Sequence, residues 1–189
     1  SWVAKGSVNG TTYIPNGFYM ENLSVANTYD TDATNSNTNA LVGGVCTAGQ
    51  AASNNQTLYN AGTLCNSQAL ALWITADQAV LNNVQLSSLQ DTLYAGSQGC
   101  GATCTAARQY FWKGRINGDV DYIFGDAAMV FDRTVFYSAY HGSATGTVTI
   151  EAQNKKAQTG SASDYLSGYV LNNAYLLSES SGMNSLYYG

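Results

Sequence analysis

Apolar and polar residues follow one another along this chain in short segments. Residues 18–28 alternate loosely and predict a pair of strands, residues 69–75 are mostly apolar, and residues 79–90 contain the sequence Val-Leu-Asn-Asn-Val-Gln-Leu. Asn, Ser, Thr and Gly bound these segments, and such residues favour turns. The sequence contains no long segment with the 3.6-residue apolar period of an amphipathic helix. The pattern therefore predicts an all-β protein built from many short strands.

A repeat within the sequence indicates how these strands are arranged. Val-Leu-Asn-Asn occupies residues 80–83 and occurs again at residues 170–173. We interpret the interval between the two copies as about four turns of a coil of about 20 residues, a repeat length found in solenoids. Two similar strands of a β-sandwich would also produce the repeat, so that fold stays open as the alternative.

Two aspartates lie within apolar, β-prone blocks. Asp91 belongs to Gln-Asp-Thr-Leu-Tyr at 90–94, and Asp121 belongs to Gly-Asp-Val-Asp-Tyr-Ile-Phe-Gly at 118–125. The interval between them includes the Gly- and Cys-containing stretch 96–105. If that stretch loops out, the interval shortens to about one turn of the predicted coil.

A similar interval separates two glutamines, since Gln68 precedes Gln90 by about one turn of the same coil. Neighbouring parallel strands lie about 4.8 Å apart, so Gln68, Gln90 or Asp91, and Asp121 would meet on one face of the coil. Two carboxyls at that separation do not ionise equally, which supplies a proton donor and an anion together. Ester hydrolysis requires this combination, although a structural cap is the alternative role for each aspartate.

Composition and charge narrow the function classes. The 189 residues have a formal net charge of −5, and only 10% of them are charged, while Asn, Ser, Thr, Gly and Tyr abound. This composition favours an extracellular β-protein that faces carbohydrate. The negative charge argues against nucleic acid as a partner, because the sequence contains no basic cluster to neutralise phosphates. The sequence also lacks an apolar run long enough to span a membrane.

The four cysteines indicate an oxidising compartment. Cys46, Cys65, Cys100 and Cys104 fall in two stretches rich in Gly, Ala, Thr and Asn, and their even number is consistent with disulfides. We expect Cys46 to pair with Cys65 and Cys100 with Cys104, although all three connectivities stay open. A metal site is disfavoured because Cys100 and Cys104 have no second closely spaced pair, and His141 is the one histidine.

Four blocks together resemble a known family. They are Gln-Ala-Leu-Ala-Leu at 68–72, Gln-Asp-Thr-Leu-Tyr at 90–94, Arg-Gln-Tyr-Phe at 108–111 and Val-Asp-Tyr-Ile-Phe-Gly at 120–125. In order and spacing these blocks resemble the signature blocks of pectin methylesterases, and the resemblance covers roughly residues 17–189. It implies a right-handed parallel β-helix, the pectin-lyase-like solenoid, within which residues 30–66 and 96–106 are insertion loops.

The resemblance also implies roles for individual residues. Asp121 resembles the nucleophile that attacks the C6 methyl ester of a galacturonosyl unit, and Asp91 resembles the general acid that then becomes the base. Gln68 and Gln90 resemble the donors of the oxyanion hole, which neutral amides can form. Positions that would stack on sugar faces in the groove are Tyr94, Val120 and Phe124. The implied substrate is methyl-esterified homogalacturonan, with no metal and no organic cofactor.

The sequence departs from the family pattern at several places. Tyr122 replaces the usual Phe, so its hydroxyl needs a partner if the side chain is buried. Asp119 and Asp126 add acids near Asp121 and, if unpaired, would raise its pKa. Residues 186–189 resemble the lead-in to a Gly-Arg-Pro-Trp block, so the expected arginine would be the next residue. The resemblance therefore implies that residues 1–189 are the central part of one domain, incomplete at both ends and inactive without that arginine.

Three hypotheses for function follow. The first is a secreted, monomeric pectin methylesterase of cell-wall modification or degradation, located in the periplasm or on the outer membrane if the source is bacterial. The second is a related esterase or thioesterase with a non-pectin substrate, which the two insertions would favour. The third is a non-catalytic, glycan-binding β-helix. The paired glutamines favour acyl transfer over glycoside cleavage, because a tetrahedral oxyanion needs neutral donors.

Overall fold

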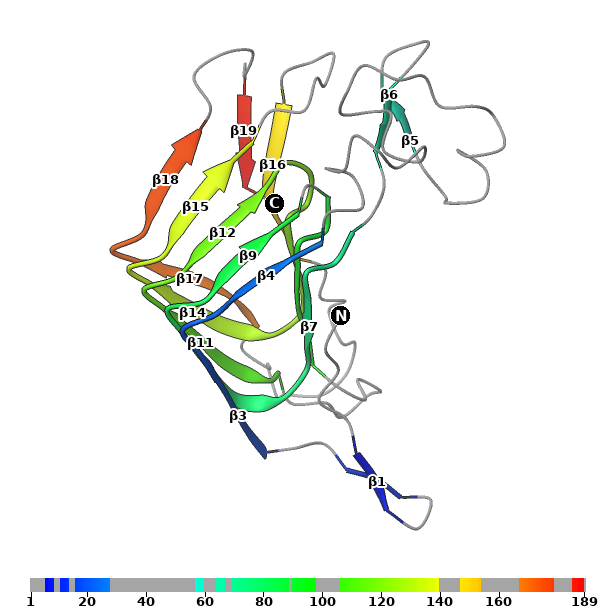
Figure 1. The fold of residues 1–189 in the computed structure, drawn as a ribbon, viewed down its shortest axis with the longest axis vertical. Helices are drawn as coiled ribbons and strands as arrows, with labels where there is room; N and C mark the ends of the chain where they lie inside the picture. Colours follow the sequence, from blue (N-terminus) through cyan, green and yellow to red (C-terminus); the bar gives the residue numbers. More distant parts are fainter. Residues whose placement is uncertain are drawn as a thin grey trace, which may run out of the picture.

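A computed structural model describes the backbone of most of the coil. The described residues are 6–8, 11–13, 16–27, 57–59, 64–66, 69–88, 90–97, 106–139, 147–153, 167–178 and 185–188. Every element in this part of the chain is a β-strand (Figure 1). Consequently, no helix that could cross a membrane occurs among these residues.

Fifteen of the strands form three parallel sheets of five strands each. Sheet 1 consists of β7 (Leu72–Ile74), β10 (Leu93–Ala95), β13 (Ile123–Gly125), β16 (Thr147–Gln153) and β19 (Ser185–Tyr188). Sheet 2 consists of β3 (Asn16–Glu21), β8 (Asp77–Asn82), β11 (Arg108–Trp112), β14 (Ala128–Asp132) and β17 (Gly168–Asn172). Sheet 3 consists of β4 (Ser24–Ala26), β9 (Gln85–Ser87), β12 (Arg115–Gly118), β15 (Val135–Ser138) and β18 (Tyr175–Ser178).

The remaining strands form two antiparallel pairs outside the coil. One pair is β1 (Gly6–Val8) with β2 (Thr11–Tyr13), and the other is β5 (Thr57–Tyr59) with β6 (Leu64–Asn66). The second pair lies within residues 30–66, which the sequence had indicated as one long loop. The described part of that insertion therefore has a short hairpin of its own.

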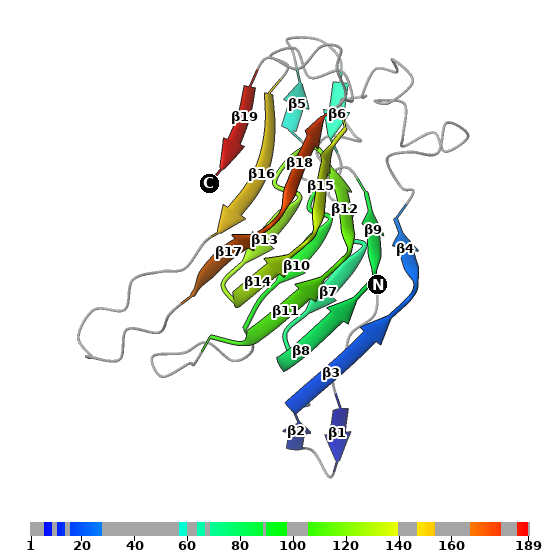
Figure 2. The same ribbon diagram turned by 90° about the vertical axis from the view of Figure 1, so that its left-hand side faces the viewer.

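The order of strands shows that the chain winds as a parallel β-helix. Each turn passes from sheet 1 to sheet 2 to sheet 3 and then pairs in parallel with the turn before it, as Figures 1 and 2 show. The all-β, parallel β-helix prediction is confirmed. The count of turns in the internal repeat was wrong, because Val80, Tyr110, Val130 and Val170 are successive register partners and span three turns. The turns from Val80 to Tyr110 and from Val130 to Val170 contain more residues than the expected coil length of about 20.

The core fills the inside of the coil with stacked apolar side chains. Leu72, Leu93 and Ile123 are register partners in sheet 1, and each is at most 1% exposed. On the facing sheets, the ring centroids of Phe131 and Phe136 lie 5.1 Å apart in an edge-to-face contact. Because side chains alternate along a strand, every inward row of a sheet has an outward row beside it. The candidate functional residues lie in the outward row of sheet 1 and in the residues just before its strands.

A buried glutamine fixes the corner between sheets 1 and 2. Gln109 is 4% exposed, and its side-chain amide donates to the carbonyls of Ile74, Ala76 and Gly96 at 3.1–3.4 Å. These carbonyls lie where the chain leaves sheet 1, at a point where regular strand pairing ends. The amide supplies donors that the interrupted sheet does not, so Gln109 is a structural member of the block at 108–111.

Several predicted residues lie outside the described part of the chain. Gln68, Cys46, Cys100 and Cys104 are among them, and of Cys65 only the backbone is described, in β6 opposite Leu58. The disulfide pairings and the role of Gln68 therefore stay predictions.

Candidate active site

Parallel pairing brings the two aspartates to the same position on adjacent turns. Gln90 forms an isolated parallel bridge with Val120, and the Asp91 N–H donates to the Val120 carbonyl at 3.0 Å. Further along, Leu93 pairs with Ile123, and the separation of this pair along the chain equals that of the two aspartates. The predicted juxtaposition of the two carboxyl-bearing residues is therefore what the register produces.

Both aspartates have an unusual backbone conformation. Asp91 has φ 59° and Asp121 has φ 48°, which places both in the left-handed region. Asp tolerates this region better than most residues, but the conformation still has an energetic cost. It interrupts the alternation of the strand just before sheet 1 begins. Strained backbone of this kind is frequent at functional sites, where the surrounding structure maintains it.

The two carboxyl groups differ in their electrostatic surroundings. Burial, together with the nearby charge of Asp121, raises the pKa of Asp91 to about 6, while a hydrogen bond from the Gln90 side chain opposes the shift. Burial also raises the pKa of Asp121. Asp91 is 8% exposed, whereas Asp121 is half-buried. Two interacting carboxyls lose their protons in separate steps, so over a range of pH Asp91 holds a proton while Asp121 is ionised.

Next to the aspartates, aromatic rings form a ladder on the outer face of sheet 1. Trp73, Tyr94 and Phe124 occupy register-matched positions on three successive turns. The ring centroids of Trp73 and Tyr94 lie 4.3 Å apart, and those of Tyr94 and Phe124 lie 5.0 Å apart. Such rings present apolar faces on which the flat faces of sugars can stack. The carboxyl pair lies just before β10 and β13, the strands that carry Tyr94 and Phe124.

Comparison with known proteins assigns the family. A family profile described as Pectinesterase matches residues 23–187. This chain belongs to the pectinesterase family. The matched range includes both aspartates, Gln90 and the whole aromatic ladder of this pectinesterase chain.

Individual relatives support the assignment over shorter stretches. A pectinesterase of Sitophilus oryzae is 38% identical over 72 residues, which cover 38% of this chain and 18% of that protein. Pectinesterase 1 of Solanum lycopersicum is 38% identical over 76 residues, covering 40% of this chain and 12% of that protein. The matched segments thus span less than a fifth of each of these relatives.

Solved structures agree with the fold. The rice weevil pectin methyl esterase superposes with a TM-score of 0.50 at 27% identity, over 61% of this chain and 28% of that chain. The pectin methylesterase from carrot superposes with a TM-score of 0.58 over 93% of this chain and 43% of that chain. At 20% identity, the carrot structure supports the fold alone.

Two departures from the family pattern now have structural explanations. Tyr122 is fully buried, and its hydroxyl finds a partner, because it lies 3.2 Å from the Ser138 hydroxyl. The Asp126 carboxylate accepts the Ser97 N–H at 2.6 Å, so it fastens a turn beside the ladder. Burial raises the pKa of Asp121. The pKa of Tyr94 is also raised, mainly by burial and then by the nearby Asp126 carboxylate.

Sequence reasoning missed Trp73 as a member of the ladder. Trp73 is 41% exposed and precedes Tyr94 by about one turn of the coil, an interval close to the one between the two glutamines. Counting back about one turn of the coil from Tyr94 would have identified Trp73. Val120 was predicted to line the groove, and the structure shows it as the bridge partner of Gln90 at the entry to sheet 1.

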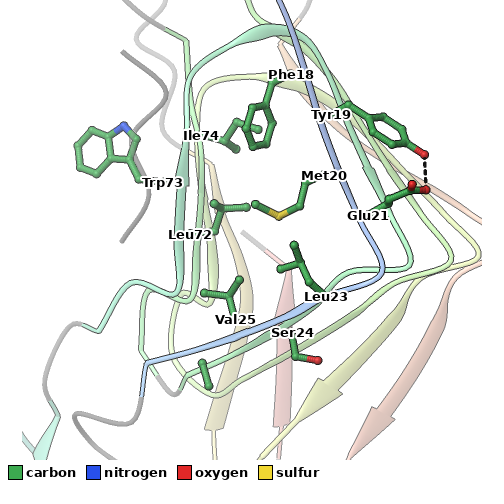
Figure 3. A pocket seen from close by; sticks show the side chains of 11 residues that line it. Phe18, Tyr19, Met20, Glu21, Leu23, Ser24, Val25, Leu72, Trp73 and Ile74 are labelled. Atoms are coloured by element: carbon green, nitrogen blue, oxygen red, sulfur yellow. Dashed lines mark hydrogen bonds between the residues drawn. The ribbon is translucent and has the colours of Figure 1, made fainter. Parts of the chain in front are cut away.

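A large cavity of about 730 Å³ lies apart from the carboxyl pair. It opens between β3, β4 and β7. On the first turn, sheets 2 and 3 have β3 and β4, whereas the described part of sheet 1 begins with β7 on the second turn. Figure 3 shows Phe18, Met20 and Leu72 directed into it, while Trp73 points away. These inward side chains continue the core rows of the coil. The cavity is therefore an extension of the apolar interior and contributes no groups to the chemistry.

Proposed function

We propose that this chain supplies the central catalytic residues of a pectin methylesterase, which hydrolyses the C6 methyl esters of homogalacturonan to carboxylate and methanol. The observation that supports this most is the pairing of Asp91 and Asp121 on adjacent turns, where burial raises both pKa values and the Asp121 charge raises that of Asp91 further. Family membership adds to it. The aromatic ladder beside the pair suits a polysaccharide substrate.

In the first half of the reaction, the ionised carboxylate of Asp121 attacks the ester carbonyl carbon. The new C–O bond pushes the carbonyl electrons onto oxygen, which gives a tetrahedral oxyanion. Gln90 has two amide N–H groups. One is engaged by Asp91, and the other is the proposed donor to that oxyanion. Gln68 is proposed as a second donor. Removing one donor of this kind typically costs about 2.7 to 4 kcal/mol of transition-state stabilisation.

The oxyanion then collapses and the bond to the methoxy oxygen breaks. Protonated Asp91 gives its proton to that oxygen, so methanol leaves as a neutral molecule and an acyl anhydride remains on Asp121. Asp91, now ionised, removes a proton from water, and the resulting hydroxide attacks the anhydride. Asp121 departs as a carboxylate, and the galacturonate product is released. Each group returns to its starting state, as general acid and base catalysis requires.

The pH dependence follows from the same pair. The attacking group must be ionised, so activity should rise with pH as Asp121 loses its proton. The departing methanol must be protonated, so activity should fall as pH increases through the Asp91 pKa of about 6. We therefore propose a bell-shaped profile, with the alkaline limb set by Asp91. The apparent pKa values of the two limbs belong to the interacting pair of carboxyls and not to either residue alone.

The proposed setting is extracellular. A substrate of the plant cell wall places the enzyme outside the cell that makes it, in agreement with the low charge and the four cysteines. We propose that the complete protein acts as a monomer, because the ladder and the carboxyl pair lie on one face of one coil.

The test is methanol release from methyl-esterified galacturonan by the natural gene product that carries this sequence. Asp121→Asn should lower the rate by about a thousandfold or more, because an amide is a poor nucleophile. Asp77→Asn is the matched control, since Asp77 lies on sheet 2 and pairs with Arg108. Its rate should stay within about twofold of the parent. No methanol from a folded parent would reject the proposal, and turnover of small acyl esters alone would favour the esterase with a non-pectin substrate.

A further inference from the structure

The corner between sheets 2 and 3 repeats one backbone conformation on five turns. At this corner the residues with positive φ are Asn22 (54°), Asn83 (52°), Lys113 (52°), Arg133 (52°) and Asn173 (50°). Asn is favoured in the left-handed region. It also links neighbouring turns, since the Asn83 side-chain amide donates to the Asn22 side-chain oxygen at 2.9 Å. Lys and Arg therefore replace the residue that this position prefers on two turns in the middle of the column.

The two cations are neighbours along the column. Trp112 pairs with Asp132, and the N–H of Lys113 donates to the Asp132 carbonyl at 2.9 Å. Lys113 and Arg133 therefore follow register-matched residues on adjacent turns, with backbones about 4.8 Å apart. Cationic side chains that leave the backbone at adjacent positions repel each other where their charged ends approach, and an anion between them removes that repulsion. A costly conformation and two adjacent cations at one place point to a function.

Aromatic rings hold the cations of this corner in place. The ammonium of Lys113 lies 4.3 Å from the ring centroid of Trp112, and the guanidinium of Arg115 lies 4.5 Å from that of Tyr137. Arg115 also donates to the Asn117 side-chain oxygen at 2.7 Å. Side chains that are already ordered lose less entropy when they bind an anion. The corner therefore presents three cations on two adjacent turns, and two of these cations are held against aromatic rings.

The charges of the corner remain positive in sum. Within the part of the chain that the structure describes, the one ion pair joins Arg108 to Asp77, away from this corner. The acid nearest the three cations in sequence is Asp132. Its carboxylate accepts the Tyr110 hydroxyl at 2.6 Å and the Asn172 amide at 3.2 Å, so it has neutral partners. A second acid, Glu21, precedes Asn22 in the same column and accepts the Tyr19 hydroxyl at 2.8 Å. Three positive charges against these two acids leave a local excess of one in a chain of net charge −5.

We propose that this corner is a second binding surface, specific for de-esterified galacturonan. Lys113, Arg115 and Arg133 would bind carboxylates on successive sugar units, and the planar guanidinium of Arg suits a carboxylate particularly well. The choice of de-esterified galacturonan as ligand rests on the proposed function, because this polyanion is the product of that reaction. The surface lies on sheets 2 and 3, whereas the aspartate pair lies at sheet 1. The protein would therefore stay attached to stretches of polymer that it has already de-esterified.

The test measures binding of polygalacturonate to the natural gene product at low and at high salt. The double variant Lys113→Asn, Arg133→Asn should bind about tenfold more weakly at low salt, and the difference should shrink at high salt. It should fold at least as well as the parent, because Asn fits the column. Lys113→Asn alone is compared with Arg108→Gln, which removes one positive charge from sheet 2 outside the corner. The first should weaken binding at least threefold and the second less than twofold.

Several results would overturn the inference. They are no binding by the parent, a loss smaller than threefold in the double variant, and an equal loss for fully methyl-esterified pectin, which is uncharged. Methanol release from a short methyl-esterified oligosaccharide is measured in parallel and should be unchanged in the corner variants. If the parent releases no methanol, the proposed function fails, while the binding comparison still decides whether the corner binds polyanions.

Discussion

Replacing Asp91 with Asn should make the protein inactive and, above pH 6, more stable. Asp91 is 8% exposed, and burial and the charge of Asp121 raise its pKa from 3.8 to about 6. The folded state therefore holds this proton more tightly than the unfolded state does. Below pH 3.8 Asp91 is protonated in both the folded and the unfolded state, and its burial carries no charge penalty. As pH rises through about 6, the folded state must bury an ionised carboxylate, and stability falls. An amide has the same shape and never acquires the charge.

The size of the effect follows from the pKa shift. A shift from 3.8 to about 6 corresponds to about 3 kcal/mol of penalty on the ionised form at high pH. Solvent and salt at the edge of the site screen part of this penalty, so we expect about 1 to 2 kcal/mol. Asp91→Asn should therefore unfold at higher denaturant than the parent at pH 8. At pH 3.5 the two proteins should be equal, because the parent side chain is then largely neutral in both states.

Urea unfolding at pH 3.5 and pH 8 measures this difference. Asp77→Asn is the matched control, since its ion pair with Arg108 lowers the Asp77 pKa to about 2. The sign is opposite there, because the contribution of Asp77 is present above 3.8 and lost as pH falls toward 2. That variant should be less stable than the parent at pH 8. An Asp91→Asn protein that is equally or less stable than the parent at pH 8 would refute the assignment of Asp91 as a destabilised buried acid.

The remaining predictions concern the same pair and its supports. Asp121→Asn should lower the pKa of Asp91 but leave it above 3.8, because burial remains the largest cause of the shift. A pH titration of the Asp91 carboxyl carbon by NMR measures this, and an unchanged pKa would mean that the two groups do not interact. Gln109→Met should cost about 1 to 3 kcal/mol in urea unfolding, because three carbonyls lose a donor; a neutral result would mean that water replaces the amide. Gly125→Ala should cost at least about 1 to 3 kcal/mol, since φ is +123° and a Cβ would lie 2.2 Å from the Ala95 carbonyl oxygen; wild-type stability would contradict that geometry.

The fold was predictable because the sequence features that specify it are local and recur along the chain. Short alternating segments bounded by turn residues predict strands wherever they occur, and an interval that repeats along the chain predicts that the strands stack. The residues that bear the carboxyl pair were predictable for the same reason, since Asp91 and Asp121 lie one turn apart. The number of turns was misjudged because the turns differ in length, and the sequence does not show how many residues each turn contains.

The sequence by itself determined the strand pattern, the coil and the spacing of the aspartates, because each depends on residue type and on distance along the chain. Tertiary structure alone decided what surrounds those residues. The pKa of Asp91 depends on how deeply the carboxyl is buried and on which charge faces it. Trp73 joins the ladder, and Lys113 and Arg133 become neighbours, because of the register between turns. Burial and register are properties of packed neighbours distant in sequence, so they appear only when the coil is closed.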